Sequence, residues 1–257
     1  MDDAQLLDLA ADLARQAGAA ILAVRARGFE TLRKADASPV TEADHAAELI
    51  IVQGLRAAAP GIPVIAEEEH AAGDRHEPGR EYWLVDPLDG TREFAALRDE
   101  FTVNVGLVRD GRPVLGVVGV PAYGELFGGT VGGLHASSRA WKRTAMGEQA
   151  INARVQPEAG LDVLASRHYA ADARLGTFLQ GRRVASVSHL GSALKIVRVA
   201  EGVADLYPRF GRTMEWDTAA PQAVLEAAGG HIRCMDGAQL LYGKSGWENP
   251  PFVCTGL

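Results

Sequence analysis

Two segments with the pattern of amphipathic helices begin the chain, and five strand-like segments follow them. This order constrains the fold more than any other feature. Apolar side chains recur at helical spacing over residues 3–24. A second helix is expected over 41–58, because Thr41 and Asp44 form the pattern of a capping box. The β-branched and aromatic segments that follow are 62–66, 82–86, 101–108, 113–121 and 125–130. Since no helical pattern separates them, we predict an antiparallel sheet covered by the first two helices.

The second half of the chain changes to an alternation of strand and helix patterns. Strands are expected at 163–166, 184–188 and 204–207. Helices are expected at 170–179, 192–201 and 217–228. We therefore predict an α/β protein with an α+β half over 1–155 and an α/β half over 156–257, packed as one compact unit with a site between them.

Composition excludes several classes of function. The 257 residues include 26 Lys and Arg against 33 Asp and Glu, a formal net charge of −7, so we expect no nucleic acid polymer as partner. The first residues lack the basic and apolar segments of a signal peptide, and no stretch reaches transmembrane length. Cys234 and Cys254 have no metal-ligand spacing and are too few for a disulfide framework. These features predict a cytoplasmic protein.

The most informative motif is an acidic turn after a predicted strand. The apolar segment 83–85 runs into the sequence DPLDGT at 86–91. Such a turn directs two carboxylates and a backbone carbonyl to one spot, and Mg²⁺ takes oxygen ligands of this type. Asp86, the Leu88 carbonyl and Asp89 are therefore a candidate metal site. The alternative is a solvated Asp-Pro and Asp-Gly turn that ends a strand.

Further acidic residues lie at other predicted boundaries. The triplet 67–69 follows the strand 62–66, and neighbouring strand ends can bring Glu67 close to Asp86. Carboxylates held close together need a cation. The alternative is a charged surface loop. Asp217 begins a predicted helix, where it is either a further ligand or only the helix cap.

A group of cations later in the chain suggests an anion site. Segment 191–195 begins a predicted helix, where free amides and the Ser192 hydroxyl suit an anion. Lys195 and Arg209 would supply charge-assisted hydrogen bonds to a phosphate. The alternative is an ordinary helix cap with surface cations.

Four of these motifs, in this order, resemble those of the metal-dependent, lithium-sensitive phosphomonoesterase superfamily that includes inositol monophosphatase. The matching segments are 36–44, 66–68, 83–91 and 215–220, which span most of the chain. Because four spaced motifs in one order are more specific than any one alone, we prefer the metal-site interpretation. The resemblance implies a layered αβαβα sandwich of the sugar-phosphatase type.

The same resemblance implies a site for two or three Mg²⁺ ions and a phosphate. The implied metal ligands are Glu67, Asp86, the Leu88 carbonyl, Asp89 and Asp217, with Asp44 near a further, weaker ion. The implied catalytic residues are Glu67, Thr91 and Asp86. The implied substrate-binding residues are Gly90, Thr91, Ser192, Lys195, Arg209 and Asp217.

A mechanism follows from this resemblance. Two cations about 3.5–4 Å apart would bridge the phosphate, lower the pKa of a bound water and stabilise the leaving oxygen. Glu67 and Thr91 would orient and deprotonate that water for in-line attack without a covalent intermediate. An acidic cleft of this kind is expected to bind an anionic substrate poorly when no metal is bound.

Within the superfamily the chain resembles most the CysQ branch, the 3'(2'),5'-bisphosphate nucleotidases. The similarity rests on 86–94, 100–104, 191–195 and 207–209. It implies hydrolysis of a small phosphorylated nucleotide, 3'-phosphoadenosine 5'-phosphate, to AMP and phosphate, which removes a by-product of sulfate assimilation. The alternatives are an inositol- or sugar-phosphate monophosphatase and a non-catalytic phospho-ligand or metal-binding protein. Monomer and homodimer both stay open, as does peripheral contact with the cytoplasmic side of the inner membrane.

Two departures from the branch concern substrate selection more than metal chemistry. The branch usually carries SRSH after its central strand, whereas 166–169 reads SRHY, which moves the histidine one place to His168. The branch's GSSxK is GSALK at 191–195, which removes one hydroxyl.

Overall fold

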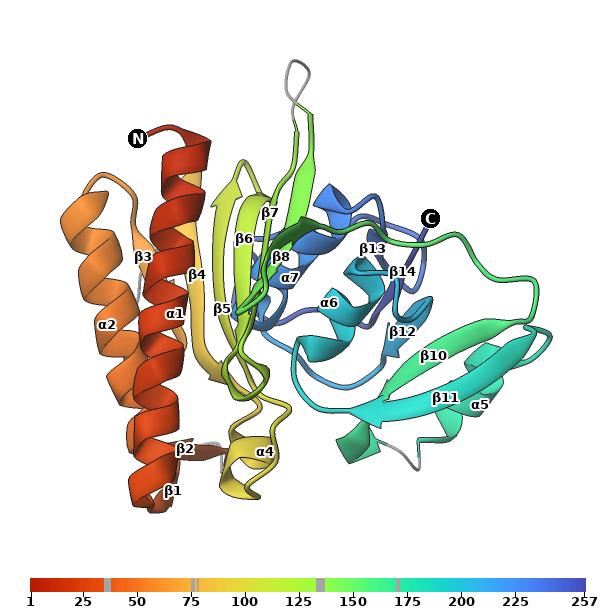
Figure 1. Cartoon of the computed structure of the whole chain (residues 1–257), viewed down its shortest axis with the longest axis horizontal. Helices are drawn as coiled ribbons and strands as arrows, with labels where there is room; N and C mark the ends of the chain where they lie inside the picture. The colour runs from red at the N-terminus through yellow and green to blue at the C-terminus, as the bar shows by residue number, and fades with distance from the viewer. Residues whose placement is uncertain (35–37, 75–76, 78, 133–136, 170–171) are drawn as a thin grey trace.

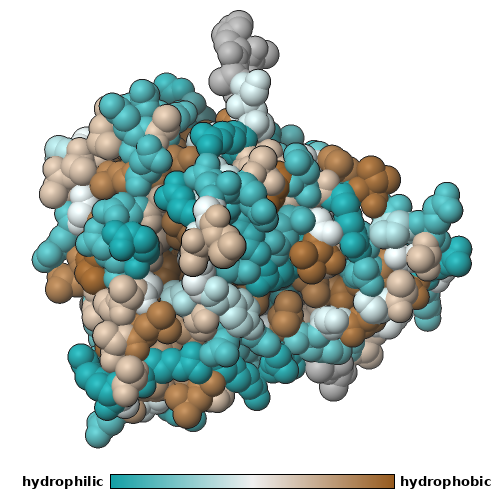
Figure 2. Space-filling model, viewed as in Figure 1, coloured by the Kyte–Doolittle hydropathy of each residue, from teal (hydrophilic) through white to brown (hydrophobic). Residues whose placement is uncertain are grey.

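The computed structural model describes most of the chain. The described residues are 1–34, 38–74, 77, 79–132, 137–169 and 172–257. Asp36 and Ala37 of the first resemblance motif and Ala170 at the start of a predicted helix lie outside them. No helix in these ranges combines the length and apolar content needed to cross a bilayer. The face in Figure 2 is largely hydrophilic, with hydrophobic residues in small separate groups.

The first two helices are α1 (Asp3–Arg27) and α2 (Glu42–Ala58), and both begin at a capped residue. The backbone amide of Ala43 donates to the Thr41 hydroxyl at 3.1 Å, and the Thr41 amide donates to Asp44 Oδ2 at 2.7 Å. The predicted capping box is therefore confirmed. A ribbon of β1 (Thr31–Arg33) and β2 (Pro39–Thr41), which the sequence analysis missed, connects the two helices.

A seven-stranded sheet holds the segments predicted as strands in the first half. Its order is β3 (Val64–Ala66), β4 (Glu81–Asp89), β5 (Thr102–Arg109), β6 (Arg112–Val120), β7 (Glu125–Thr130), β8 (Arg139–Thr144) and β9 (Gly147–Ala150). The pairs from β4 onward are antiparallel, as predicted, but β3 pairs with β4 in parallel. A parallel pair needs a crossover connection, and the segment that includes the short helix α3 (Glu67–Ala71) makes it. The sequence analysis missed α3, α4 (Thr91–Ala95), β8 and β9.

The second half forms a five-stranded mixed sheet. Its order is β11 (Val184–Leu190), β10 (Leu161–Ser166), β12 (Leu206–Arg209), β14 (Phe252–Thr255) and β13 (His231–Cys234). Its helices are α5 (Ala173–Leu179), α6 (Leu194–Ala200) and α7 (Glu215–Ala227). Single 3-10 turns lie at Pro121–Tyr123 and Arg167–Tyr169. The sequence analysis missed β13 and β14, so the predicted strand and helix alternation holds only up to α7.

The elements stack in five layers. In Figure 1, α1 and α2 cover one face of the seven-stranded sheet, α6 and α7 lie between the two sheets, and α5 lies beside β10 and β11. Apolar side chains of α1 and α2 pack on the first sheet around buried Trp83 and Phe101. Phe178 of α5 packs against the apolar cluster that includes Val163 of β10. The predicted α/β class and αβαβα layering are confirmed.

Glycines in the first sheet let α7 lie directly on it. A Cβ atom on Gly116 of β6 would lie 2.3 Å from the carbonyl oxygen of Ala220, and one on Gly106 of β5 would lie 2.7 Å from the Ala220 nitrogen. No larger residue fits there without moving the helix. A helix from the second half is thus fixed against the first sheet, although the division of the chain at 155 and 156 itself stays a prediction.

Candidate active site

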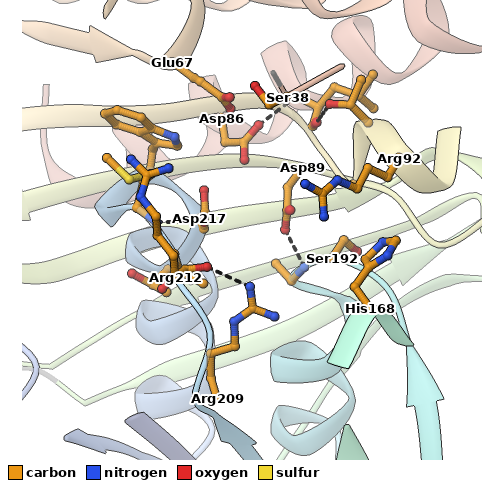
Figure 3. Close-up of a pocket in the computed structure, with 18 of the residues that line it drawn as sticks. Ser38, Glu67, Asp86, Asp89, Arg92, His168, Ser192, Arg209, Arg212 and Asp217 are labelled. Atoms are coloured by element: carbon orange, nitrogen blue, oxygen red, sulfur yellow. Dashed lines mark hydrogen bonds between the residues drawn. The ribbon is translucent and has the colours of Figure 1, made fainter. Parts of the chain in front are cut away.

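A cavity of about 570 Å³ lies where the two halves of the chain meet. Its walls include residues from both sheets and from α7 (Figure 3). Of the residues predicted for the site, those that line the cavity are Glu67, Asp86, Leu88, Asp89, Gly90, Thr91, Ser192, Lys195, Arg209 and Asp217. Asp44 is the predicted site residue that does not reach the wall. The structure thus brings together segments far apart in sequence.

The pairing of β3 with β4 brings Glu67 and Asp86 together. Ala66 pairs with Val85, so the two acidic residues follow at the same level of neighbouring parallel strands. Asp86 is only 2% exposed. Burial, and then the charge of Glu67, raise the pKa of Asp86 well above its usual range. The expected approach of these two carboxylates is confirmed.

Asp89 and Asp217 complete the acidic side of the cavity. Asp217 lies in the first turn of α7, and its Oδ2 accepts the Met214 amide at 2.8 Å. The helix begins at Glu215, two residues before the predicted start, and Asp217 caps it as the third helical residue rather than as the N-cap residue. Burial raises the pKa of Asp217, and the nearby Asp89 and Glu67 charges raise it further. Burial also raises the pKa of Asp89.

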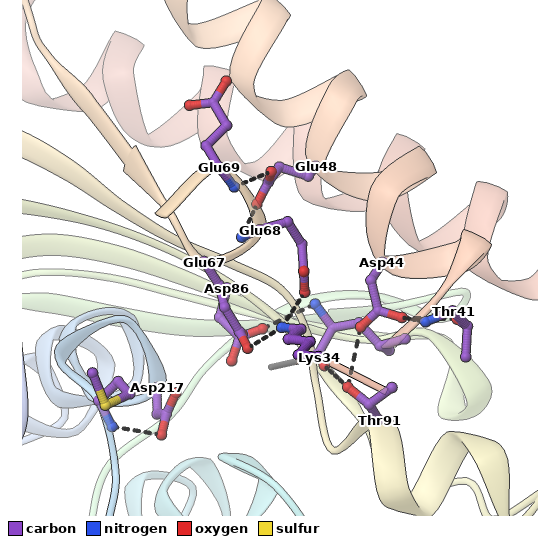
Figure 4. Close-up of polar contacts among 12 residues, drawn as sticks. Lys34, Thr41, Asp44, Glu48, Glu67, Glu68, Glu69, Asp86, Thr91 and Asp217 are labelled. Atoms are coloured by element: carbon purple, nitrogen blue, oxygen red, sulfur yellow. Dashed lines mark hydrogen bonds and ion pairs between the residues drawn. The ribbon is translucent and has the colours of Figure 1, made fainter. Parts of the chain in front are cut away.

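The lysine that follows β1 neutralises part of this acidic group. Lys34 Nζ lies 2.7 Å from Glu67 Oε1 and 2.6 Å from Glu68 Oε1 (Figure 4). Burial opposes the charged form of Lys34, but the charges of Glu67 and Glu68 raise its pKa overall. The sequence analysis missed Lys34, because a single lysine beside a short ribbon has no motif of its own.

A second buried carboxylate holds α3 in place. Glu48 of α2 accepts the backbone amides of Glu68 at 2.8 Å and Glu69 at 2.9 Å (Figure 4). These amides have no partner within the helix. Burial raises the pKa of Glu48 to about 7 and that of Glu68 to about 7. Glu48 therefore fixes the direction in which Glu67 enters the cavity.

The acidic side has the donor chemistry of a hard divalent cation. Its carboxylates and the Leu88 carbonyl are oxygen donors, which Mg²⁺ prefers. One oxygen of each carboxylate accepts a hydrogen bond from the protein. For Asp86, the Leu88 amide donates to Oδ1 at 3.0 Å. Across the described ranges, no three His, Cys, Asp or Glu side chains are already arranged to hold an ion. The donor set fits Mg²⁺, and an ion at Glu67 would replace the Lys34 ammonium.

Thr91 lies between the cavity and Asp44. Its hydroxyl is 3.1 Å from Asp44 Oδ1 and 3.1 Å from the Leu88 carbonyl. Asp44 is 1% exposed, and Thr41 occupies its second oxygen. These contacts make Asp44 a support for Thr91, and its role as ligand of a weaker ion stays a prediction. Gly90, at φ +92°, permits the turn that presents Thr91.

The amides before α6 are not free, contrary to expectation. The Ala193 amide donates to Asp89 Oδ2 at 2.5 Å, and the Gly191 amide donates to Glu100 Oε2 at 3.0 Å. The expected anion site at these two amides is therefore wrong, because carboxylates already occupy them. Ser192 holds a left-handed backbone at φ +47°, which strains a residue other than glycine.

Lys195 lines the cavity but is only 2% exposed. Its Nζ donates to the Ser192 carbonyl at 2.5 Å and lies 5.1 Å from the centre of the Tyr207 ring. Burial lowers the pKa of Lys195 to about 8. The cation therefore contributes positive charge at the cavity wall, and its ammonium donates to two backbone carbonyls.

Several cavity residues were missing from the sequence-based site. His168 Nε2 lies 2.8 Å from Glu93 Oε1, and Glu93 is 2% exposed. Arg92 and Arg212 also line the cavity, at opposite sides in Figure 3. Arg92 and Glu93 follow DPLDGT directly, so their place in that motif was an available signal. Arg212 has none.

Comparison with known proteins identifies relatives along the whole chain. The model of the inositol monophosphatase family matches residues 2–251. The 3'(2'),5'-bisphosphate nucleotidase CysQ of Shigella flexneri is 42% identical over 96% of this chain and 98% of its own. The crystal structure of CysQ from Bacteroides thetaiotaomicron superposes with a TM-score of 0.80 at 31% identity, covering 98% of this chain and 97% of its own. An inositol monophosphatase from Anabaena superposes at 0.74 and 26% identity, covering 98% and 90%.

Proposed function

The chain belongs to the inositol monophosphatase family, and we propose that it is a Mg²⁺-dependent 3'(2'),5'-bisphosphate nucleotidase. The proposed substrate is 3'-phosphoadenosine 5'-phosphate, with AMP and phosphate as products. The relatives that carry this name match the chain over nearly its full length, at up to 42% identity. Members of this family are metal-dependent phosphatases, and the choice of a nucleotide substrate rests on the cavity.

The observation that carries this choice is a cavity with an acidic and a basic side. Glu67, Asp86 and Asp217 lie on one side, and Arg209 of β12 enters from the other (Figure 3). The acidic side suits a metal-assisted reaction at one phosphate. The basic side suits a second anionic group on the same molecule. A nucleotide with two phosphates carries both.

The acidic side would hold the metal. We propose two or three Mg²⁺ ions with Glu67, Asp86, the Leu88 carbonyl, Asp89 and Asp217 as ligands. When bound, Mg²⁺ supplies positive charge to the phosphate and makes water a stronger acid. The raised pKa values of Asp86 and Asp217 support this assignment, because buried carboxylates that repel one another favour a cation.

The side chains of the protein would orient the attacking water. The single hydroxyl proton of Thr91 is donated to Asp44 or to the Leu88 carbonyl, so the Thr91 oxygen keeps lone pairs that can accept from water. Glu67 lies at the same cavity wall and would take the proton of that water. The rigid supports of both residues keep them in place during the reaction.

The substrate side would bind the rest of the nucleotide. Arg209 is held by the Gly211 carbonyl at 3.2 Å and the Arg212 carbonyl at 2.8 Å, which fixes its guanidinium at the cavity. Gly90, Ser192 and Lys195 remain proposed binding residues, with Lys195 acting through its charge. We include a cytoplasmic location in this proposal. Both cysteines are free thiols, as is usual in a reducing compartment.

The test is a comparison of two substrates under the same Mg²⁺ concentration. The value of kcat/KM for 3'-phosphoadenosine 5'-phosphate should exceed that for inositol 1-phosphate by at least roughly 100-fold, because charge-assisted contacts to the second phosphate are lost with inositol. A preference for inositol 1-phosphate would replace the proposal with an inositol monophosphatase. Release of phosphate from neither substrate would indicate a non-catalytic binding protein.

A further inference from the structure

Within the part of the chain that the structure describes, one cation at the cavity has no protein partner. Among the described residues, the lysines and arginines of the wall are Lys34, Arg92, Lys195, Arg209 and Arg212. Lys34 pairs with carboxylates, Lys195 and Arg209 donate to backbone carbonyls, and Arg212 pairs with Glu248 at 3.1 Å. In the described ranges, the guanidinium of Arg92 makes no hydrogen bond, ion pair or ring contact. Its donors are therefore available to a ligand.

Arg92 lies in the wall of the cavity. It follows Thr91 in α4 and is exposed. Figure 3 shows its guanidinium beside Asp89 and on the same side of the cavity as Ser192 and His168, across from Asp217 and Arg212. When the reacting phosphate of the substrate lies at the acidic side, Arg92 would face another part of the substrate.

The chemistry of the side chain defines what that part is. A guanidinium presents five N–H donors in a planar fork that matches two oxygens of a phosphate. The contact is rigid and charge-assisted, so it discriminates a phosphate from a neutral hydroxyl. The arginine itself is anchored by α4, whose short turn is fixed between Thr91 and the buried Phe94.

We propose that Arg92 binds the non-reacting phosphate of a bisphosphorylated nucleotide and thereby sets the preference for two phosphates over one. This inference rests on the proposed function and adds a specificity-determining residue to it. Arg92 and Arg209 then hold the second phosphate from different walls, one from the end of α4 and the other from β12.

The test measures kcat/KM for 3'-phosphoadenosine 5'-phosphate divided by kcat/KM for adenosine 3'-phosphate, which lacks the second phosphate. In Arg92→Gln this ratio should fall roughly 10- to 100-fold relative to the unchanged protein, as expected for a lost charge-assisted bond. The loss should lie mainly in KM for the bisphosphate. Arg92→Lys should recover part of the ratio, because it restores the charge without the fork.

Arg98→Gln is the matched control, because Arg98 is an exposed arginine close in sequence that does not line the cavity. Its ratio should equal that of the unchanged protein. An unchanged ratio in Arg92→Gln would overturn the inference, as would equal losses for both substrates, which would assign Arg92 to the reacting phosphate. If the unchanged protein itself shows no preference for the bisphosphate, the proposed function fails rather than the role of Arg92 alone.

Discussion

The two sides of the cavity differ in how the protein supports them. In the acidic wall, which consists of Glu67, Asp86, Asp89 and Asp217, Asp86 is buried and the other three are half-buried, and each carboxylate has a partner within the protein. In the basic rim, which consists of Arg92 and Arg209, Arg92 is exposed and Arg209 is half-buried. Arg92 has no partner in the described ranges, whereas Arg209 is held by backbone carbonyls.

This difference separates two tasks of the site. Burying carboxylates together costs free energy unless a cation compensates their charge, so the acidic wall is built for an ion that all substrates share. A guanidinium stays charged at all ordinary pH values, and an exposed one such as that of Arg92 can meet a ligand directly. We infer that the acidic wall carries the reaction and that the basic rim selects the substrate.

The largest effect is expected at the acidic wall. Asp86→Asn should lower kcat roughly 1,000-fold, because it removes a charged ligand from the metal site. The variant should fold, since it removes a buried repulsive charge rather than a packed apolar group. Phosphate release measured beside a thermal melt separates the two effects. Unchanged release in a folded Asp86→Asn protein would contradict the role of the acidic wall.

A smaller effect is expected at the hydroxyl beside the wall. Thr91→Val keeps the shape of the side chain and removes the group that would orient the water, so kcat should fall roughly 100-fold. Thr91→Ser is the matched control, because it keeps a hydroxyl. Steady-state kinetics with the bisphosphate provide the measurement. Equal activity of the Val and Ser variants would exclude a role for the hydroxyl.

Lys34 tests whether the acidic wall is poised for a cation. In Lys34→Met the ammonium no longer competes for Glu67, so Mg²⁺ should bind roughly tenfold more tightly in a calorimetric titration. In EDTA the same variant should melt at a lower temperature, because Glu67 and Glu68 lose their partner. Weaker Mg²⁺ binding would instead assign Lys34 to the support of the metal site.

The smallest effect concerns pH and the support of α3. The folded protein raises the pKa of Glu48 to about 7, whereas an unfolded chain has a value of about 4.3. Between these values the folded state binds the proton more tightly, so this group's contribution to the free energy of unfolding falls as pH rises. As the pH is lowered from about 7 to about 4.3 in EDTA, protonation of Glu48 should therefore stabilise the unchanged protein. Glu48→Gln lacks this contribution, so over the same pH range its melting temperature should rise less, or fall more, than that of the unchanged protein. Parallel pH profiles would contradict this role of Glu48.

The sequence predicted the parts of the fold that depend on local patterns. The capping box at Thr41 and Asp44 fixed the start of α2, and the apolar segments predicted most strands of the first sheet. The parallel pairing of β3 and the two strands β13 and β14 depend on contacts between distant segments, which periodicity does not encode.

The residues of the site also divide into those that local motifs predict and those that depend on contacts between distant segments. The carboxylates stand in motifs at strand ends, so their meeting was predictable from strand pairing. The Gly191 amide donates to Glu100, and the Ala193 amide donates to Asp89. No motif spacing predicts contacts between residues so far apart in the sequence. Lys34 and the pair of His168 with Glu93 likewise emerged only from the packing.

We propose that the acidic wall works only with a divalent cation, and a Mg²⁺ titration of the EDTA-treated protein tests this most directly. Phosphate release from 3'-phosphoadenosine 5'-phosphate should be absent in EDTA and should rise to saturation as Mg²⁺ is added. Release in EDTA at the rate seen with saturating Mg²⁺ would contradict the claim.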